Sequence, residues 1–227
     1  FAGDDRDALM ADLRRLDACI GDHGFADAVV EVPEPVRQKS VWEVREACLN
    51  IMMSMKGDGK PVSFIEDCAV PLEHLADYTD AVTEVFTKHG TRGTWYAHAS
   101  VGCLHVRPIL NMKEGEGVAK MRAIAEETSE LVRRYKGSYS GEHGDGQARG
   151  ALLEKMFGPE LMAAFREFKT LWDPAGKMNP GKLITPYEPH ENLRLGSQYA
   201  PWNPETHFSF TEDYGRMNHA ALRCVGV

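Results

Sequence analysis

TWYAHASVGCLHVRPIL, residues 94–110, contains one run typical of a β-strand on each side of Val101-Gly102. A hairpin that turns at Val101-Gly102 pairs residues whose numbers sum to 203, so His98 would lie directly opposite His105. Opposed side chains project from one face of a sheet, with Cβ atoms about 4.5–5.5 Å apart. Valine suits a tight two-residue turn poorly, but a four-residue loop around residues 100–103 keeps the same parity. The stretch therefore predicts a hairpin with both histidines on one face.

Helical and extended patterns alternate along the rest of the chain, with Asp4 or Asp5 expected to cap the first helix and Ser40 the second. The expected helices cover residues 5–20, 40–55, 71–90 and 116–135, followed by two short helices divided at Gly158-Pro159, and the expected strands cover residues 28–32, 62–67, 94–98 and 103–110. This order predicts an α+β fold, an antiparallel sheet with helices packed on one face and a C-terminal irregular arm. The lack of a G-x-G-x-x-G motif argues against a doubly wound nucleotide-binding fold.

The composition excludes several classes of function. The 227 residues carry a net charge of −8 and no run rich in Lys or Arg, so no nucleic-acid partner is expected. No apolar run approaches the ~20 residues that a membrane span needs. Five scattered cysteines without a C-x-x-C motif favour a reduced, cytoplasmic setting over a disulfide framework.

Two histidines on one sheet face can share a metal ion, or they can stay half-exposed without a ligand, and the pair alone favours the second interpretation. The glycine-rich stretch SGEHGDG, residues 140–146, changes this balance. Together with His98 and His105, Glu142 would provide three ligands and leave a coordination position open for water or substrate. His143 could then act as a general base, because its unperturbed pKa lies near neutrality. The alternative for this stretch is a surface turn.

Two arginines are candidates for binding a substrate carboxylate. Arg107 follows His105 by two positions and shares its strand face, where a cation beside a metal site suits a carboxylate. Arg45 lies off the apolar stripe of its helix, so it is either a solvated cation or a second carboxylate contact. Four further polar residues cannot be sorted from sequence: Lys60, Asp67, Asp145 and Arg149.

Four stretches in this order resemble the C-terminal domain of FAD-linked oxidases, the group that includes D-lactate dehydrogenases, the glycolate oxidase D subunit and D-2-hydroxyglutarate dehydrogenase. The stretches are IEDCAVP (65–71), HASVGCLHVRP (98–108), SGEHGDG (140–146) and DPAGKMNPGK (173–182). On this resemblance, residues 1–185 are the substrate and cap domain and residues 186–227 a linker arm. The sequence looks like large bacterial members that fuse this unit to an iron–sulfur module, and LRCVGV (222–227) looks like the start of a cysteine-rich segment.

The resemblance implies a ferredoxin-like sheet that caps an FAD bound mainly by a separate N-terminal domain, which this chain lacks. The reaction it implies is oxidation of a D-2-hydroxy acid to a 2-oxo acid. The implied site comprises the metal ligands His98, His105 and Glu142, commonly for zinc, the base His143 and the substrate contact Arg45, with Asn179 and Lys182 as cofactor contacts. An iron–sulfur module or redox partner would carry the electrons onward, and peripheral membrane association is expected only through electron acceptors.

The sequence also departs from the family pattern. Val101-Gly102-Cys103 stands where Asp-Gly-Asn is usual, and Arg107 replaces the usual Asn, so Arg107 is expected to take over a substrate carboxylate. Two other functions remain open from the residues themselves. One is a metal-dependent hydrolase that uses the same three ligands with His143 as base, and the other is a non-catalytic ferredoxin-like binding module with a structural metal.

Overall fold

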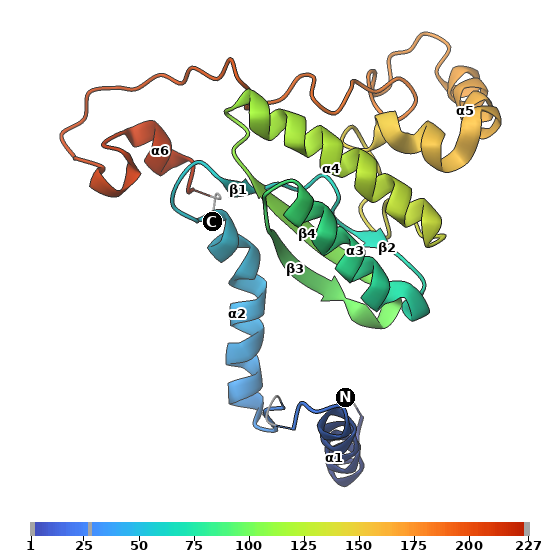
Figure 1. The fold of residues 1–227 in the computed structure, drawn as a ribbon, viewed down its shortest axis with the longest axis vertical. Helices are drawn as coiled ribbons and strands as arrows, with labels where there is room; N and C mark the ends of the chain where they lie inside the picture. The colour runs from blue at the N-terminus through green and yellow to red at the C-terminus, as the bar shows by residue number, and fades with distance from the viewer. Residues whose placement is uncertain (1–2, 27–28, 225–227) are drawn as a thin grey trace. The chain divides into compact units, whose positions relative to one another are not determined.

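The computed structural model describes residues 3–26 and 29–224, which belong to two compact units, residues 1–49 and 50–227 (Figure 1). In the first unit, α1 (Arg6–Asp22) follows Asp5. The Asp5 carboxylate accepts hydrogen bonds from the backbone N–H groups of Asp7 (2.9 Å) and Ala8 (3.1 Å). These bonds satisfy amides that the first helical turn leaves without partners, and they confirm the predicted cap.

The predicted strand at residues 28–32 is wrong for its described part. Residues 29–32 form no strand, and Ala28 lies outside the described residues. An extended segment becomes a strand only when a second segment pairs with its backbone groups. Here the side chain of Gln38 donates to the carbonyl oxygen of Val32 (2.8 Å) instead.

The second helix starts earlier than predicted. α2 (Pro35–Met53) begins five residues before Ser40 and runs across the boundary between the two units. Proline suits a first helical position, because its backbone angle is already helical and its missing N–H is not needed there. Ser40 therefore lies inside the helix, where its hydroxyl donates to the carbonyl oxygen of Val36 (3.3 Å).

The second unit is built on an antiparallel sheet whose central strand is β4 (Cys103–Leu110). β3 (Gly93–His98) pairs along one edge of β4. Two short strands, β1 (Lys60–Pro61) and β2 (Cys68–Ala69), pair with opposite ends of the other edge. The chain between β1 and β2 leaves the sheet and returns to it.

That excursion replaces the strand predicted at residues 62–67. Phe64 and Ile65 are both buried, so the apparent alternation of apolar and polar residues does not correspond to two faces of a strand. Asp67 has a φ of 58°, in the left-handed region, which ends any extended run. The resulting bend carries Glu66 and Asp67 to the residues of the candidate site described below.

The predicted hairpin is confirmed, but its predicted register is wrong. His98 pairs with Cys103 and His105 pairs with Tyr96, so paired residue numbers sum to 201 instead of 203. The loop is a 3₁₀ turn, η2 (Ala99–Val101), closed by Gly102 at φ 70°; a Cβ there would lie 2.0 Å from the carbonyl oxygen of Val70. The glycine therefore ends the loop instead of sitting at its centre. A shift by two residues preserves parity, so both histidines still share a face.

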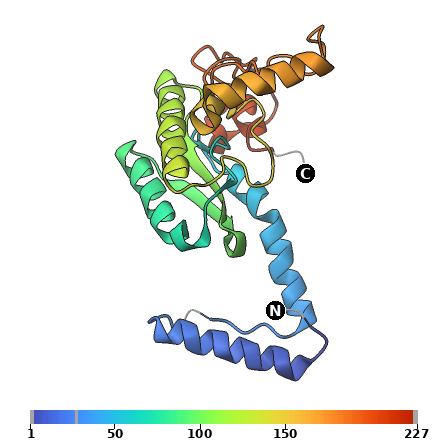
Figure 2. The same cartoon turned by 90° about the vertical axis from the view of Figure 1, so that its right-hand side faces the viewer.

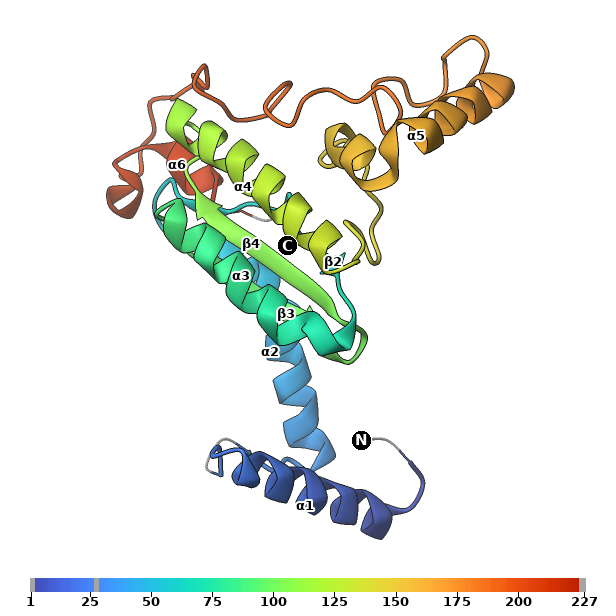
Figure 3. The same cartoon turned by 45° about the vertical axis from the view of Figure 1, so that its right-hand side comes forward.

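The helices α3 (Leu75–Lys88), which follows the 3₁₀ turn η1 (Leu72–His74), and α4 (Gly115–Arg134) cover the same face of the sheet (Figures 2 and 3). The core between these layers includes Val82, Phe86, Ile124 and Val132 from the helices and Leu104 and Val106 from β4. This packing confirms the predicted α+β class with helices on one face. Because side chains alternate along a strand, His105 and Arg107 project from the opposite face.

The remainder of the chain agrees with the predicted pattern. After the turn η3 (Gly150–Leu152), α5 (Leu153–Trp172) is interrupted at Gly158, whose φ of 78° confirms the predicted division of this helix. The arm that follows is irregular except for η4 (Thr211–Asp213) and α6 (Met217–Ala221). Residues 225–227 of LRCVGV lie outside the described residues. In the described part of the chain, no helix has both the length and the apolar character needed to cross a membrane.

Candidate metal centre

The sheet face opposite the helices carries the two hairpin histidines. The rings of His98 and His105 lie 5.0 Å apart, edge to face, and Tyr96 on β3 contacts both rings. His105 is buried, whereas His98, at the end of β3, is partly exposed. In the observed register the two histidines are not directly opposite each other. They still lie on the same face, and their rings are in contact.

Glu142 from the glycine-rich loop completes this group. Its Oε1 lies 3.4 Å from Nε2 of His98, and its Oε2 lies 3.4 Å from Nε2 of His105. One ligand atom from each of the three residues falls within 4.8 Å of the others. The structure therefore brings together the three ligands predicted from sequence, although Glu142 is 37 residues from His105.

The donor set fits a divalent ion such as zinc. Zinc accepts imidazole nitrogens and carboxylate oxygens, and three protein ligands leave a fourth position open. With bonds of about 2.0–2.1 Å, ligand atoms at tetrahedral angles lie roughly 3.3 Å apart. Each histidine Nε2 lies 3.4 Å from a different oxygen of Glu142, close to that spacing and longer than the about 2.7–2.9 Å of a charged hydrogen bond.

His143 lies beside this group with about half of its side chain (53%) exposed. Its Nε2 lies 3.5 Å from Oε2 of Glu142, and its ring stacks on His105 with centroids 5.5 Å apart. Its Nδ1 lies 3.7 Å from Asp67 and 3.9 Å from Glu66. An exposed imidazole among carboxylates can accept a proton from a ligand bound at the open metal position.

Asp67 holds the loop that carries Glu142 and His143. It is completely buried, and its Oδ2 accepts hydrogen bonds from Ser140 Oγ (2.6 Å) and from the backbone N–H groups of Glu142 (3.0 Å) and His143 (2.8 Å). Nη1 of Arg149 donates to its Oδ1 (2.8 Å). Burial by itself would raise the pKa of Asp67, but these donors outweigh burial and keep the pKa below its usual value.

Glu66 holds the hairpin side of the site. Its Oε1 lies 2.6 Å from Nη2 of Arg107 and 3.4 Å from Nδ1 of His105. Arg107 is buried on the face shared with His105, as predicted, and its Nε donates to Ser63 Oγ (3.0 Å). Glu66, His105 and His143 form a second group with metal-ligand spacing. The close guanidinium of Arg107 already neutralises Glu66, so the first group suits a metal better.

The sequence pattern does not indicate the supporting role of these two residues. Asp67 is one of four polar residues that the sequence cannot sort, and no pattern points to Glu66. The available signal was their position together in IEDCAVP, directly before β2. Arg149 and Asp145 also prove to be loop residues. Nη2 of Arg149 donates to the carbonyl oxygen of Gly144 (2.7 Å), and burial raises the pKa of Asp145 despite the nearby Arg149.

The other predicted site residues either belong to the first unit or have the contacts and backbone angles described here. Arg45 belongs to the first unit, where its guanidinium lies 5.3 Å from the centre of the Trp42 ring. Lys182 donates to the side chain of Gln147 in the glycine-rich loop. Asn179 is an exposed turn residue at φ 48°. Lys60, one of the unsorted residues, donates to the carbonyl oxygen of Met55.

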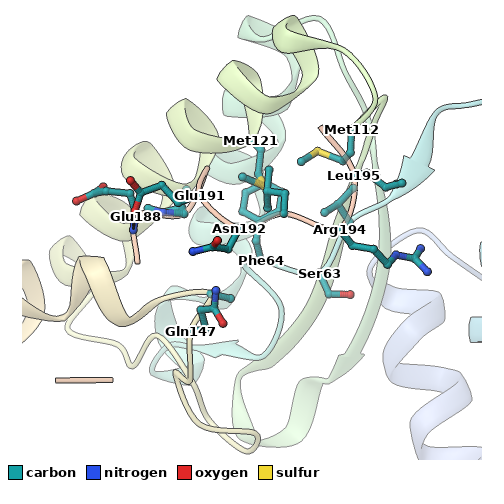
Figure 4. Close-up of a pocket in the computed structure, with 15 residues that line it drawn as sticks. Ser63, Phe64, Met112, Met121, Gln147, Glu188, Glu191, Asn192, Arg194 and Leu195 are labelled. Atoms are coloured by element: carbon teal, nitrogen blue, oxygen red, sulfur yellow. Dashed lines mark hydrogen bonds between the residues drawn. The ribbon is translucent and has the colours of Figure 1, made fainter. Parts of the chain in front are cut away.

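A pocket of about 340 Å³ lies between α4 and residues 188–195 (Figure 4). Its inner wall is apolar and includes Phe64, Met112 and Met121. The pocket shares none of the three metal-type ligands. Its lining includes Ser63, the hydrogen-bond partner of Arg107, and Gln147, the hydrogen-bond partner of Lys182.

Comparison with known proteins defines the class of this chain. Residues 1–183 match the family described as FAD linked oxidases, C-terminal domain, and the chain belongs to that family. It is similar to D-2-hydroxyglutarate dehydrogenase of Haemophilus influenzae, with 37% identity over 153 residues, covering 67% of this chain and 15% of the relative. The Escherichia coli enzyme of the same name is 34% identical over 191 residues, covering 82% of this chain and 19% of the relative.

More distant relatives include the glycolate oxidase subunit GlcD of Bacillus subtilis, 24% identical over 178 residues, covering 78% of this chain and 37% of the relative. The chain thus spans 15–19% of the length of the two D-2-hydroxyglutarate dehydrogenases. These findings confirm the family resemblance seen in the four sequence motifs.

Proposed function

We propose that this chain is the metal- and substrate-binding domain of an FAD-dependent dehydrogenase that oxidises a D-2-hydroxy acid to a 2-oxo acid. The observation that carries the proposal is the convergence of His98, His105 and Glu142, with His143 beside them. Membership in the FAD-linked oxidase family and the names of the relatives support the reaction class.

In this proposal, His98, His105 and Glu142 hold a divalent ion, with zinc as the preferred candidate. When bound, such an ion would supply Lewis-acid chemistry that lowers the pKa of the substrate hydroxyl. His143 takes the hydroxyl proton on an imidazole nitrogen, and its exposure leaves it accessible to an entering substrate. FAD, held mainly by another domain, would supply the acceptor for the hydride of the α-carbon, while the hydroxyl proton goes to His143, so the two hydrogens would leave as a proton and a hydride.

The proposal extends to the predicted cations and to the arm. Arg45 and Arg107 are assigned to the substrate carboxylate, and Arg107 would share its guanidinium between that carboxylate and Glu66. Lys182 and Asn179 are assigned to cofactor contacts. Residues 186–227 are assigned as a linker toward an iron–sulfur module, which would carry electrons from the flavin to the acceptor.

Two alternatives use the same residues. A metal-dependent hydrolase would activate water at the open position with His143 as base, and a binding module would fill the metal site without an open position. The relatives are dehydrogenases and an oxidase subunit, which favours the redox reaction over both alternatives.

Anaerobic flavin reduction tests the proposal. A polypeptide that carries this domain together with its FAD-binding domain is mixed with a panel of D-2-hydroxy acids, and the absorbance of oxidised flavin is followed. At least one D-acid should bleach the flavin, while its L-enantiomer and the His143→Ala variant should not. If a chemically reducible flavin is bleached by no D-2-hydroxy acid, the proposal is wrong. Flavin-independent cleavage of an ester or amide would identify the hydrolase instead.

A further inference from the structure

We infer that Glu66 and Asp67 are a pair of positioning residues that align the two halves of the metal site. The inference rests on the proposed function, because it names the residues that place its ligands and its base. One half of the site comes from the hairpin and the other from the glycine-rich loop. The pair lies between them, on the bend that joins β1 to β2.

Asp67 fixes the loop through its backbone. One carboxylate oxygen accepts the N–H groups of both Glu142 and His143, the residues proposed as ligand and base. The carbonyl oxygen of Asp67 also accepts the N–H of Gly141 (2.8 Å), and Ser140 Oγ, bound to the same carboxylate oxygen, accepts the N–H of Gly144 (2.6 Å). Five consecutive loop residues are thus held directly or through one hydroxyl by Asp67.

Glu66 acts on the hairpin side. Its carboxylate faces Nδ1 of His105 at 3.4 Å, while Nε2 of the same ring faces Glu142. A carboxylate beside Nδ1 favours the tautomer with the proton on Nδ1, which leaves the Nε2 lone pair for a metal. Nδ1 of His105 is buried and has no hydrogen-bond partner among the described residues. The carboxylate of Glu66, 3.4 Å away, is the charged group that faces it.

The backbone of the pair explains how adjacent residues serve different halves. The left-handed angle of Asp67 lets its side chain turn toward the loop, while that of Glu66 stays against the hairpin. Nη1 of Arg149 donates both to the carbonyl oxygen of Glu66 and to Asp67 Oδ1. The guanidinium of Arg149 therefore bonds to both Glu66 and Asp67 and fixes their positions relative to each other.

Amide hydrogen exchange tests the role of Asp67 in the FAD-loaded protein. Asp67→Asn retains the shape of the side chain but replaces one acceptor oxygen with a donor. We expect exchange in the peptide covering residues 140–144 to become at least tenfold faster, with the α4 peptide unchanged. The matched control is Glu127→Gln, which changes a partly exposed carboxylate on α4 that pairs with Lys88 and His89 and should leave the loop unchanged.

Metal affinity and the spectrum of bound Co²⁺ test the effect on the site. Loss of a residue that orients a metal ligand typically weakens metal binding about 10–100-fold. We expect that loss for Asp67→Asn and for Glu66→Ala, with an altered Co²⁺ spectrum. Glu66→Gln keeps an acceptor for Nδ1–H, so it should recover most of the affinity. A merely structural role for Glu66 would not give this rescue.

Three results would overturn the inference. They are loop exchange in Asp67→Asn within twofold of wild type, metal affinities of folded Asp67→Asn and Glu66→Ala within twofold of wild type, and equal losses in Glu66→Gln and Glu66→Ala. If Asp67→Asn does not fold, Ser140→Ala removes one link of the same network and should still accelerate loop exchange. A wild type that binds no metal would refute the proposed metal centre, while the exchange result would still decide the role of Asp67.

Discussion

The buried pair of Asp67 and Arg149 should contribute measurably to the stability of the second unit. In Arg149→Met, the completely buried carboxylate of Asp67 loses the guanidinium that lies 2.8 Å away. Breaking a buried pair by removing one partner costs about 3–5 kcal/mol. Three hydrogen bonds to the other oxygen of Asp67 remain, so we expect a loss near the lower end, about 3 kcal/mol.

Urea unfolding followed by circular dichroism measures this loss. The matched control is Arg166→Met, because Arg166 pairs with Glu154 at 3.2 Å on the exposed surface of α5. Exposed pairs contribute about 0–1 kcal/mol, so this variant should stay close to wild type. The double variant Asp67→Asn/Arg149→Met should be more stable than the sum of the single losses predicts, by roughly 1–3 kcal/mol. Additive losses, or an Arg149→Met loss below that of the control, would show that Asp67 and Arg149 do not stabilise each other.

The stability difference should also depend on pH. The pKa of Asp67 is lower in the folded state than in the unfolded chain. The ionised carboxylate therefore stabilises the fold above the unfolded pKa of about 3.9. This contribution is lost as the pH falls through the folded-state pKa. The difference between wild type and Arg149→Met should shrink when the pH is lowered from 7 to 3, and a constant difference would argue against the ion pair.

Two further predictions concern a buried thiol and the hairpin loop. Iodoacetamide at pH 8 should modify the exposed Cys19 and spare Cys68, because burial raises the pKa of the Cys68 thiol to about 12. Peptide mass spectrometry measures this difference, and early modification of Cys68 would show that its thiol is not buried. Gly102→Ala should destabilise the chain by more than about 1 kcal/mol, because a Cβ there meets the Val70 carbonyl oxygen. Gly90→Ala has a similar positive φ but no atom within 4 Å, so thermal melting should show a smaller loss; equal losses would exclude the clash.

The hairpin and its histidines could be predicted because they depend on local pattern. Both the predicted pairing, with a sum of 203, and the observed pairing, with a sum of 201, place His98 and His105 on one face, because the two registers differ by an even number of residues. The register could not be predicted, because it depends on where Gly102 fits against the carbonyl oxygen of Val70, a contact with a distant residue. Helix α4 and the break at Gly158 were equally local and were predicted correctly.

The role of Glu66 and Asp67 in positioning the site residues could not be predicted from the local sequence pattern. Residues 62–67 alternate like a strand, yet Glu66 and Asp67 are placed by partners 39 to 83 residues further along the chain. Such hydrogen bonds leave no periodicity in the sequence. A sequence can thus indicate which residues could bind a metal, while the residues that align them emerge only from the folded chain.

Zinc content and turnover, measured side by side, decide whether His105 binds the metal and His143 acts as the base. Wild type, His105→Ala and His143→Ala are purified as the FAD-loaded protein and analysed by mass spectrometry for zinc and by flavin reduction for activity. We expect stoichiometric zinc with activity in wild type, stoichiometric zinc without activity in His143→Ala, and loss of both in His105→Ala. Full retention of zinc by His105→Ala would contradict the assignment of the metal site.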